Sequence, residues 1–135
     1  MKSLAEGKDV IDCYFYNIFL GVDFTDEVTF EDFSKLDIRT GTIIEAEKMK
    51  KADKLLKIKV DLGFEERTVV SGIAKFFKPE DIIGQQVLLL ANLTPRKMRG
   101  VESQGMILMT EDTNGNLVFV SPENSEKGVN GLKIS

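Results

Sequence analysis

The clearest pattern along the chain is a strict alternation of apolar and charged residues. Leu56, Ile58, Val60 and Leu62 alternate with Lys57, Lys59 and Asp61. Successive side chains of a strand point to opposite faces, so this period of two predicts a strand with one buried face and one charged, wet face. The turn-forming residues 63–66 then lead into a second predicted strand over residues 67–71.

Four further segments have the composition of strands: residues 38–47, 86–92, 105–110 and 117–120. Gly41 within the first indicates a bulged or strongly bent strand. The second is a continuous apolar run, as in a strand buried on both faces, and the third is its expected neighbour. Asn114-Gly115 is a hairpin-turn signal that leads into the last.

Helical signals are short and few. Thr29 to Asp32 resembles a capping box, with Asp32 in place of the usual Glu, and predicts one helical turn through Lys35. Residues 72–78 are predicted to form a short helix ended by Pro79, with a possible further turn at 79–83. Residues 48–54 are predicted to be a loop.

Five or six short strands with a short helix between the third and the fourth predict a mainly all-β protein. The best match is a five-stranded Greek-key barrel of the oligonucleotide- or oligosaccharide-binding type, the OB-fold. A generic small β-sandwich is the alternative, which the helix in mid-chain makes less attractive. A length of 135 residues fits one domain with an appended element.

The aromatic residues are concentrated near the N-terminus. Seven of the eleven Phe and Tyr residues fall within Tyr14 to Phe33, and residues 10–22 are the most apolar part of the chain. This run is too short for a transmembrane helix and lacks the features of a signal peptide. We expect residues 1–28 to be an extension that makes a dimer contact, forms a linker or is an artefact, and residues 29–135 to be the OB-fold domain.

The charge of the chain is unevenly distributed. The net charge is −4, but residues 48–100 carry 12 Lys and Arg against 6 Asp and Glu. Because exposed charges are screened beyond ~8 Å at physiological salt, a basic face can bind a polyanion although the protein as a whole is acidic. The overall charge therefore does not exclude an RNA partner.

The sequence contains little that suggests catalysis. Cys13 is the only cysteine and there is no histidine, so neither a disulfide framework, an ordinary zinc site nor a Cys–His nucleophile pair is expected. Phosphate-cradling GxxxxGK and GxGxxG motifs are absent. We expect no catalytic residue, no metal and no cofactor, and a reducing, cytoplasmic location.

The main candidate for a binding site is the stretch Pro95-Arg96-Lys97-Met98-Arg99-Gly100. Arginine offers a planar fork to phosphates and lysine a point charge, while Asn92, Ser103 and Gln104 can hydrogen-bond to sugars or base edges. A cationic loop between strands can equally be a solvated turn, and methionines such as Met98 and Met106 are more often packing residues than base contacts.

Two nearby segments strengthen the case for RNA. Six lysines form a second basic cluster: Lys48, Lys50, Lys51, Lys54, Lys57 and Lys59. Lys75 and Lys78 flank Phe76 and Phe77, of which at least one is expected to pack in the core. If the barrel brings these segments onto one side, they form a groove that can follow a phosphate backbone.

Five motifs in the same order resemble a known family. They are Asp37-Ile38-Arg39-Thr40-Gly41-Thr42-Ile43, Lys51-Ala52-Asp53-Lys54-Leu55, Val70-Ser71-Gly72-Ile73, Asn92-Leu93 with Pro95-Arg96-Lys97, and Ser103-Gln104-Gly105-Met106. Together they are similar to the tRNA-binding domain appended to bacterial methionyl-tRNA synthetase, which also occurs free-standing. The resemblance covers residues from about 30 to the C-terminus.

This resemblance implies a non-catalytic OB-fold module that binds tRNA by shape and backbone and forms a homodimer. Its partners would be tRNA and the catalytic region of the synthetase, in cis or in trans, with no membrane. The implied tRNA-contacting residues are Asn92, Arg96, Lys97, Ser103, Gln104 and Met106, with Lys54 and Ser71 in other signature segments. Arg99 joins them as a further phosphate-neutralising cation.

One relative of this family suggests a different function. The CsaA-like export chaperones share the barrel and the Asp37 to Thr42 opening but bind unfolded peptides. The intact Lys51 to Leu55 and Ser103 to Met106 motifs favour tRNA binding, whereas the aromatic N-terminal segment could line a peptide groove.

Overall fold

The computed structural model describes residues 26–123 and 130–135. Contacts divide the chain into two compact units, Met1–Phe33 and Ser34–Ser135, and each is considered by itself. The predicted boundary after residue 28 stays a prediction. The predicted packing of Tyr14 and of the other aromatic residues up to Phe24 lies outside the described residues. Among the described residues, no helix is long and apolar enough to cross a membrane.

The predicted capping box is present at the start of helix α2 (Phe30–Ser34). The backbone N–H of Asp32 donates to Thr29 Oγ1 at 3.0 Å, and the N–H of Thr29 donates to Asp32 Oδ2 at 3.4 Å. Both side chains thus satisfy N–H groups that a helix N-terminus would otherwise leave without an intrahelical partner.

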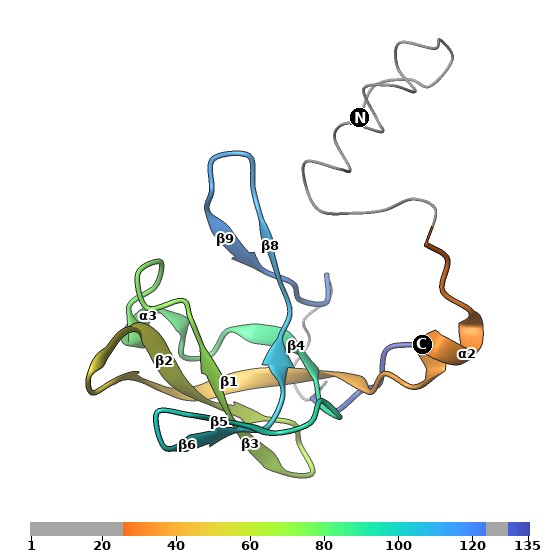
Figure 1. Ribbon diagram of the computed structural model, residues 1–135, viewed down its shortest axis with the longest axis horizontal. Helices are drawn as coiled ribbons and strands as arrows, with labels where there is room; N and C mark the ends of the chain where they lie inside the picture. Colours follow the sequence, from red (N-terminus) through yellow and green to blue (C-terminus); the bar gives the residue numbers. More distant parts are fainter. Residues whose placement is uncertain (1–25, 124–129) are drawn as a thin grey trace, which may run out of the picture. The chain divides into compact units, whose positions relative to one another are not determined.

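The second unit is built on a five-stranded antiparallel sheet, which confirms the predicted fold class (Figure 1). Its strands, in the order β3-β2-β1-β4-β7, are β3 (Glu66–Ser71), β2 (Ala52–Asp61), β1 (Ile38–Met49), β4 (Gln86–Leu90) and β7 (Met106–Ile107). Helix α3 (Pro79–Ile82) lies between β3 and β4 in the chain, as predicted. Two hairpins complete the unit, β5 (Arg96–Met98) with β6 (Val101–Ser103) and β8 (Met109–Glu111) with β9 (Leu117–Phe119).

The buried face of the sheet follows from the alternation in β2. Leu56, Ile58, Val60 and Leu62 are each fully buried, while Lys57 and Lys59 on the other face are partly exposed. Ile43, Val69, Val87 and Leu89 complete the centre of the core. Burial of these apolar side chains is the main force that holds the barrel together.

The sheet closes into a barrel between β3 and the end of β6, where Ser103 and Gln104 lie. Gln104 donates its N–H to Thr68 O at 2.8 Å, and its side-chain Oε1 accepts from Thr68 N at 3.1 Å. Ser103 Oγ accepts from Val70 N at 2.9 Å. We call this junction the closure seam. Side-chain oxygens here take the place of part of a backbone ladder.

The predicted loop over residues 48–54 is wrong. Met49 pairs with Ala52, so β1 and β2 are joined by Lys50 and Lys51 alone, and Lys51 takes a φ of 62°. The lysine-rich sequence concealed the hairpin because exposed edge and turn positions need no apolar alternation.

The predicted helix over residues 72–78 is also wrong, whereas the further turn after it is real. Phe76 N and Phe77 N both donate to Ile73 O, which makes a single turn and no regular helix. Pro79 begins α3 instead of ending a helix: Lys78 before it is extended, with a ψ of 143°. A residue before proline avoids the helical region, and proline is favoured in the first helical turn.

Gly41 is required by a close approach and not by a turn. A Cβ at this position would lie 2.7 Å from Val60 Cγ1. The predicted bulge in β1 lies slightly further along, where the register with β2 shifts between Ile43 and Glu45.

The C-terminal segment lies along the start of β1. Gly131 N donates to Thr40 O at 2.7 Å, Thr40 N donates to Leu132 O at 2.9 Å, and Ile134 N donates to Ile38 O at 2.8 Å. These bonds satisfy part of the β1 edge that β2 does not reach, since β2 pairs only from Thr42 onward.

The β8–β9 turn is held by one carboxylate. Asp112 Oδ1 accepts from the N–H groups of Asn114 and Asn116, each at 2.9 Å. The hydrogen bond from Asn116 N lowers the pKa of Asp112 below its usual value, with further help from Asn114 N and the Asn116 side chain, although partial desolvation opposes them. The predicted Asn114-Gly115 hairpin signal is confirmed.

Candidate nucleic-acid interface

The basic stretch forms a β-hairpin of its own. Met98 pairs with Val101 across a two-residue turn of Arg99 and Gly100, whose φ values are 50° and 84°. Positive φ at both central residues is the signature of a type I′ turn, which matches the twist of a two-stranded ribbon. The hairpin thus places Arg99 at its tip.

The hairpin presents cations on both of its faces. Arg96, Lys97 and Arg99 are all exposed, and neighbouring residues on a strand point to opposite sides. Arg96 lies opposite Ser103, and Lys97 lies opposite Glu102. Among the described residues, these three cations make no ion pair. A ribbon charged on both faces can contact phosphates on two sides of a groove.

Ser103 and Gln104, two of the predicted contact residues, hold the hairpin on the barrel. Ser103 is 6% exposed, and besides accepting from Val70 N its hydroxyl donates to Gly105 O at 3.3 Å. Gln104 uses its side-chain oxygen on Thr68 N. Their observed contacts within the domain position the cations.

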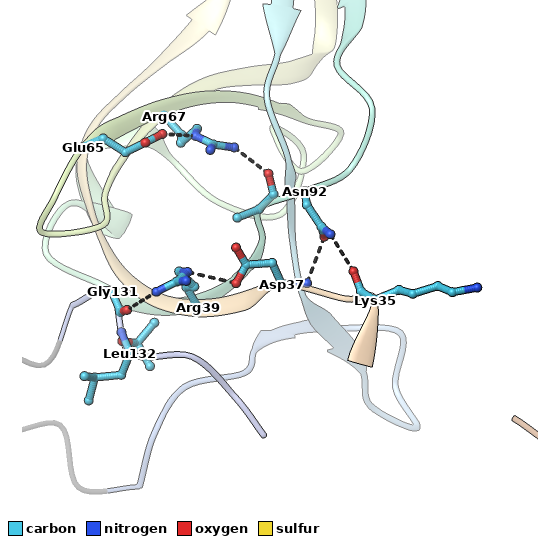
Figure 2. Close-up of polar contacts among 10 residues, drawn as sticks. Lys35, Asp37, Arg39, Glu65, Arg67, Asn92, Gly131 and Leu132 are labelled. Atoms are coloured by element: carbon cyan, nitrogen blue, oxygen red, sulfur yellow. Dashed lines mark hydrogen bonds and ion pairs between the residues drawn. The ribbon is translucent and has the colours of Figure 1, made fainter. Parts of the chain in front are cut away.

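Asn92 is a second such anchor (Figure 2). Its Oδ1 accepts from Asp37 N at 2.9 Å and its Nδ2 donates to Lys35 O at 2.6 Å. Asp37 in turn forms an ion pair with Arg39 at 2.9 Å, and Arg39 donates to Gly131 O at 2.8 Å. The Asn92 amide therefore fixes the segment that enters β1.

Arg67 has a positioning role that the sequence did not reveal. Its guanidinium pairs with Glu65 and donates to the carbonyl oxygens of Ala91 and Gln104, and Figure 2 shows the first two of these contacts. It thus joins β3 to the two chain segments on either side of the β5–β6 hairpin. The only sequence signal was an arginine at the start of a strand, which is not specific.

Changing Ser103 to alanine tests whether this residue acts through the fold. Loss of the hydroxyl leaves the buried N–H of Val70 without its acceptor, so we expect the free energy of unfolding to fall by about 1–3 kcal/mol. Denaturant titration measures this, with exposed Ser121→Ala as the control. A loss of tRNA affinity in Ser103→Ala with unchanged stability would instead assign the hydroxyl to direct contact.

Lys54 and Ser71 lie toward the end of the sheet where the β1–β2 turn is found. Ser71 pairs with Leu56, so the end of β3 lies beside the start of β2. β3 also contacts β6, through the hydrogen bond from Val70 N to Ser103 Oγ among others. In Figure 1 the β1–β2 and β5–β6 turns lie at the same end of the barrel, on the left. We call the end of the barrel that carries these two turns the cationic end.

Met106 lies away from this end and is not a core residue. It is 47% exposed on β7, opposite Leu90. Met98 is partly buried at the hairpin, which agrees with a packing role.

The second basic cluster divides into paired and exposed lysines. Lys57 lies 3.8 Å from Glu47, and Lys59 lies 3.8 Å from both Glu45 and Glu66. Glu45, Glu47, Lys57 and Lys59 line a groove of about 480 Å³ beside β1 and β2. The positive and negative charges in the groove are balanced. The remaining lysines of the cluster are exposed: Lys48, Lys50, Lys51 and Lys54.

Phe76 and Phe77 have different environments. Phe77 packs on Phe119 with ring centroids 4.9 Å apart and joins the core, whereas Phe76 is 52% exposed. The expectation that at least one of the two packs in the core is confirmed.

Comparison with known families matches residues 38–130 to the family described as "Putative tRNA binding domain". This match covers most of the barrel, including the hairpin and the closure seam. The chain belongs to this tRNA-binding domain family. Its five-stranded barrel and its five motifs are therefore those of a shared fold, as the sequence resemblance indicated.

Curated relatives of this tRNA-binding domain are methionine–tRNA ligases. The ligase of Christiangramia forsetii is 65% identical over 101 residues, and that of Flavobacterium johnsoniae is 65% identical over 98 residues. These alignments cover 75% and 73% of this chain but only 14% of each ligase. The chain thus spans about one seventh of the length of these relatives.

Solved structures similar to this chain include both a protein related to methionyl-tRNA synthetase and CsaA chaperones, the two alternatives considered from the sequence. A MetRS-related protein from Pyrococcus horikoshii is 34% identical with a TM-score of 0.73, and covers 82% of this chain and 99% of its own. The chaperone CsaA from Bacillus anthracis is 32% identical with a TM-score of 0.71, and covers 82% of this chain and 100% of its own. The fold alone does not separate these two, but the higher identity to the ligases favours the tRNA-binding branch.

Proposed function

We propose that this domain binds tRNA through the cationic end of its barrel. The observation that carries the proposal is the β5–β6 hairpin, which exposes Arg96, Lys97 and Arg99 without ion pairs among the described residues. Phosphate contacts by such cations release counterions from the nucleic acid, which supplies affinity without reading sequence. Lys54 adds a further cation at the same end. Binding is therefore expected to depend on the shape and backbone of tRNA.

The partner we propose is the catalytic region of methionine–tRNA ligase. High identity to about one seventh of these ligases supports a module that acts as their C-terminal domain, or as a separate subunit in trans. By binding tRNA near the catalytic region, the module would raise the local tRNA concentration and so increase the effective affinity. On this proposal the module is non-catalytic and acts in the cytoplasm.

A titration of labelled bulk tRNA at two salt concentrations tests the proposal, with an unfolded peptide as competitor. We expect tRNA binding that weakens with salt and that the peptide does not displace. Absence of tRNA binding together with retention of the peptide would favour the alternative, a CsaA-like export chaperone, for which the structural similarity to CsaA is the supporting observation.

We also propose that the domain forms a homodimer. Leu36, Leu93 and Met106 are 40%, 40% and 47% exposed, and the Asn92 anchor and the pairing of β4 with β7 bring their segments together. Exposed apolar side chains that adjoin one another favour contact with a second copy.

Light scattering of the full chain tests the dimer, and we expect twice the monomer mass at micromolar concentration. Leu93→Glu should shift the mass toward the monomer, while Val118→Glu, at a similarly exposed apolar position on the β8–β9 hairpin, should leave it unchanged. A monomeric wild-type chain would contradict the dimer proposal.

A further inference from the structure

Phe76 is an exposed aromatic side chain for which packing within the described residues gives no role. Single exposed apolar residues are common on protein surfaces, so its exposed fraction of 52% has little meaning alone. Its meaning comes from the rigidity of the turn that carries it and from the charges on either side.

The turn that presents Phe76 is fixed at both ends. Its N–H donates to Ile73 O at 2.9 Å, and Ile73 is itself 3% exposed. On the other side, Phe77 is held by the core through its contact with Phe119. Ala74 N also donates to Lys54 O at 3.1 Å, which ties the turn to β2. The backbone that carries Phe76 is therefore ordered before a ligand binds, and binding costs little backbone entropy.

Three lysines lie near Phe76, two of them in the same turn and one on the strand to which the turn is hydrogen-bonded. Lys75 precedes Phe76, Lys78 follows it by two residues, and Lys54 lies on the neighbouring strand; all three are exposed. Within the described residues none of them forms an ion pair. An exposed ring beside phosphate-binding charges is the combination with which proteins bind unpaired nucleotides.

We propose that Phe76 is a stacking platform for one unpaired base of the bound RNA, with Lys75 and Lys54 contacting the phosphates on either side. This inference rests on the proposed tRNA-binding function and assigns part of it to a second contact, apart from the β5–β6 hairpin. The hairpin supplies charge that any RNA duplex can satisfy. The ring adds a preference for RNA that contains an unstacked base.

The test compares Phe76→Leu with the wild-type chain on two ligands, bulk tRNA and a blunt-ended RNA duplex without unpaired bases. Leucine keeps the apolar character but removes the flat face, so we expect tRNA affinity to fall on the order of tenfold. Affinity for the duplex and the salt dependence of tRNA binding should not change, because no cation is lost. Phe64→Leu is the control for loss of an aromatic ring elsewhere: Phe64 is 60% exposed in the β2–β3 turn and its ring lies 5.3 Å from the Arg39 guanidinium.

The possible outcomes separate this inference from the proposed function. If the wild type binds tRNA and Phe76→Leu binds it equally well, the stacking role is wrong while the proposed function stands. If the wild type does not bind tRNA, both are wrong. An equal loss of affinity for tRNA and duplex, or a change in oligomeric state or peptide binding, would also overturn the stacking role.

Discussion

Replacing Lys97 and Arg99 with glutamine is expected to lower the affinity for tRNA roughly 40-fold at 0.1 M salt. Each phosphate contact contributes about 0.8 to the slope of log K against log salt, so the loss of two contacts should reduce that slope by about 1.6. Glutamine preserves the length and polarity of the side chains, and both residues are exposed. Fluorescence titrations at several salt concentrations measure both quantities.

The matched control for this variant is Lys57→Gln with Lys59→Gln. It removes the same net charge, but from lysines that lie 3.8 Å from glutamates on the outer face of β1 and β2. We expect this control to change tRNA affinity only a few-fold, because those charges are already balanced. Equal losses in the two variants would show that net charge, and not the hairpin, determines binding. A loss confined to one tRNA species would contradict recognition by shape and backbone.

Gly105→Ala is expected to lower the stability of the domain strongly. Gly105 has a φ of 145°, where residues with a Cβ are strained, and a Cβ there would lie 2.8 Å from the carbonyl oxygen of Leu90. Backbone strain and the clash with a central strand together should lower the free energy of unfolding by roughly 3 kcal/mol or more. Thermal unfolding should then occur on the order of 15 °C lower.

Gly84→Ala isolates the contribution of the clash. Gly84 also has a positive φ, 91°, but no atom lies within 4 Å of its would-be Cβ. Only the backbone penalty of about 1–2 kcal/mol is expected there. If the two variants unfold at the same temperature, the close approach of Gly105 to β4 contributes nothing to the loss of stability.

The sequence was sufficient where one physical effect dominates. The alternation from Leu56 to Leu62 has a single explanation, a strand with one buried face, and the structure agrees. The hairpin at Asn114-Gly115 was predictable because glycine readily adopts the positive φ that its turn requires, here 84°. The fold class followed from patterns of this kind, whereas the family followed from the resemblance of five motifs.

The sequence was insufficient where tertiary contacts decide the conformation. Residues 72–78 have no strong caps, and the core contact of Phe77 and the restriction imposed by Pro79 select turns over a helix. The same is true of the site. Exposed charge at Arg96 and Lys97 could be predicted from residue type, but the partners of Asn92 and Ser103 lie far away in the sequence.

The closure seam has a consequence for how members of the family can be recognised. Ser103 Oγ and Gln104 Oε1 accept hydrogen bonds from backbone N–H groups of β3 and so join it to the end of β6. Barrels that bind different ligands can share such a motif, because each of them must close. A search based on this motif will therefore find proteins that share the fold but bind different ligands. We expect the number of cations without ion pairs at the β5–β6 hairpin to distinguish the members that bind RNA from those that bind other ligands.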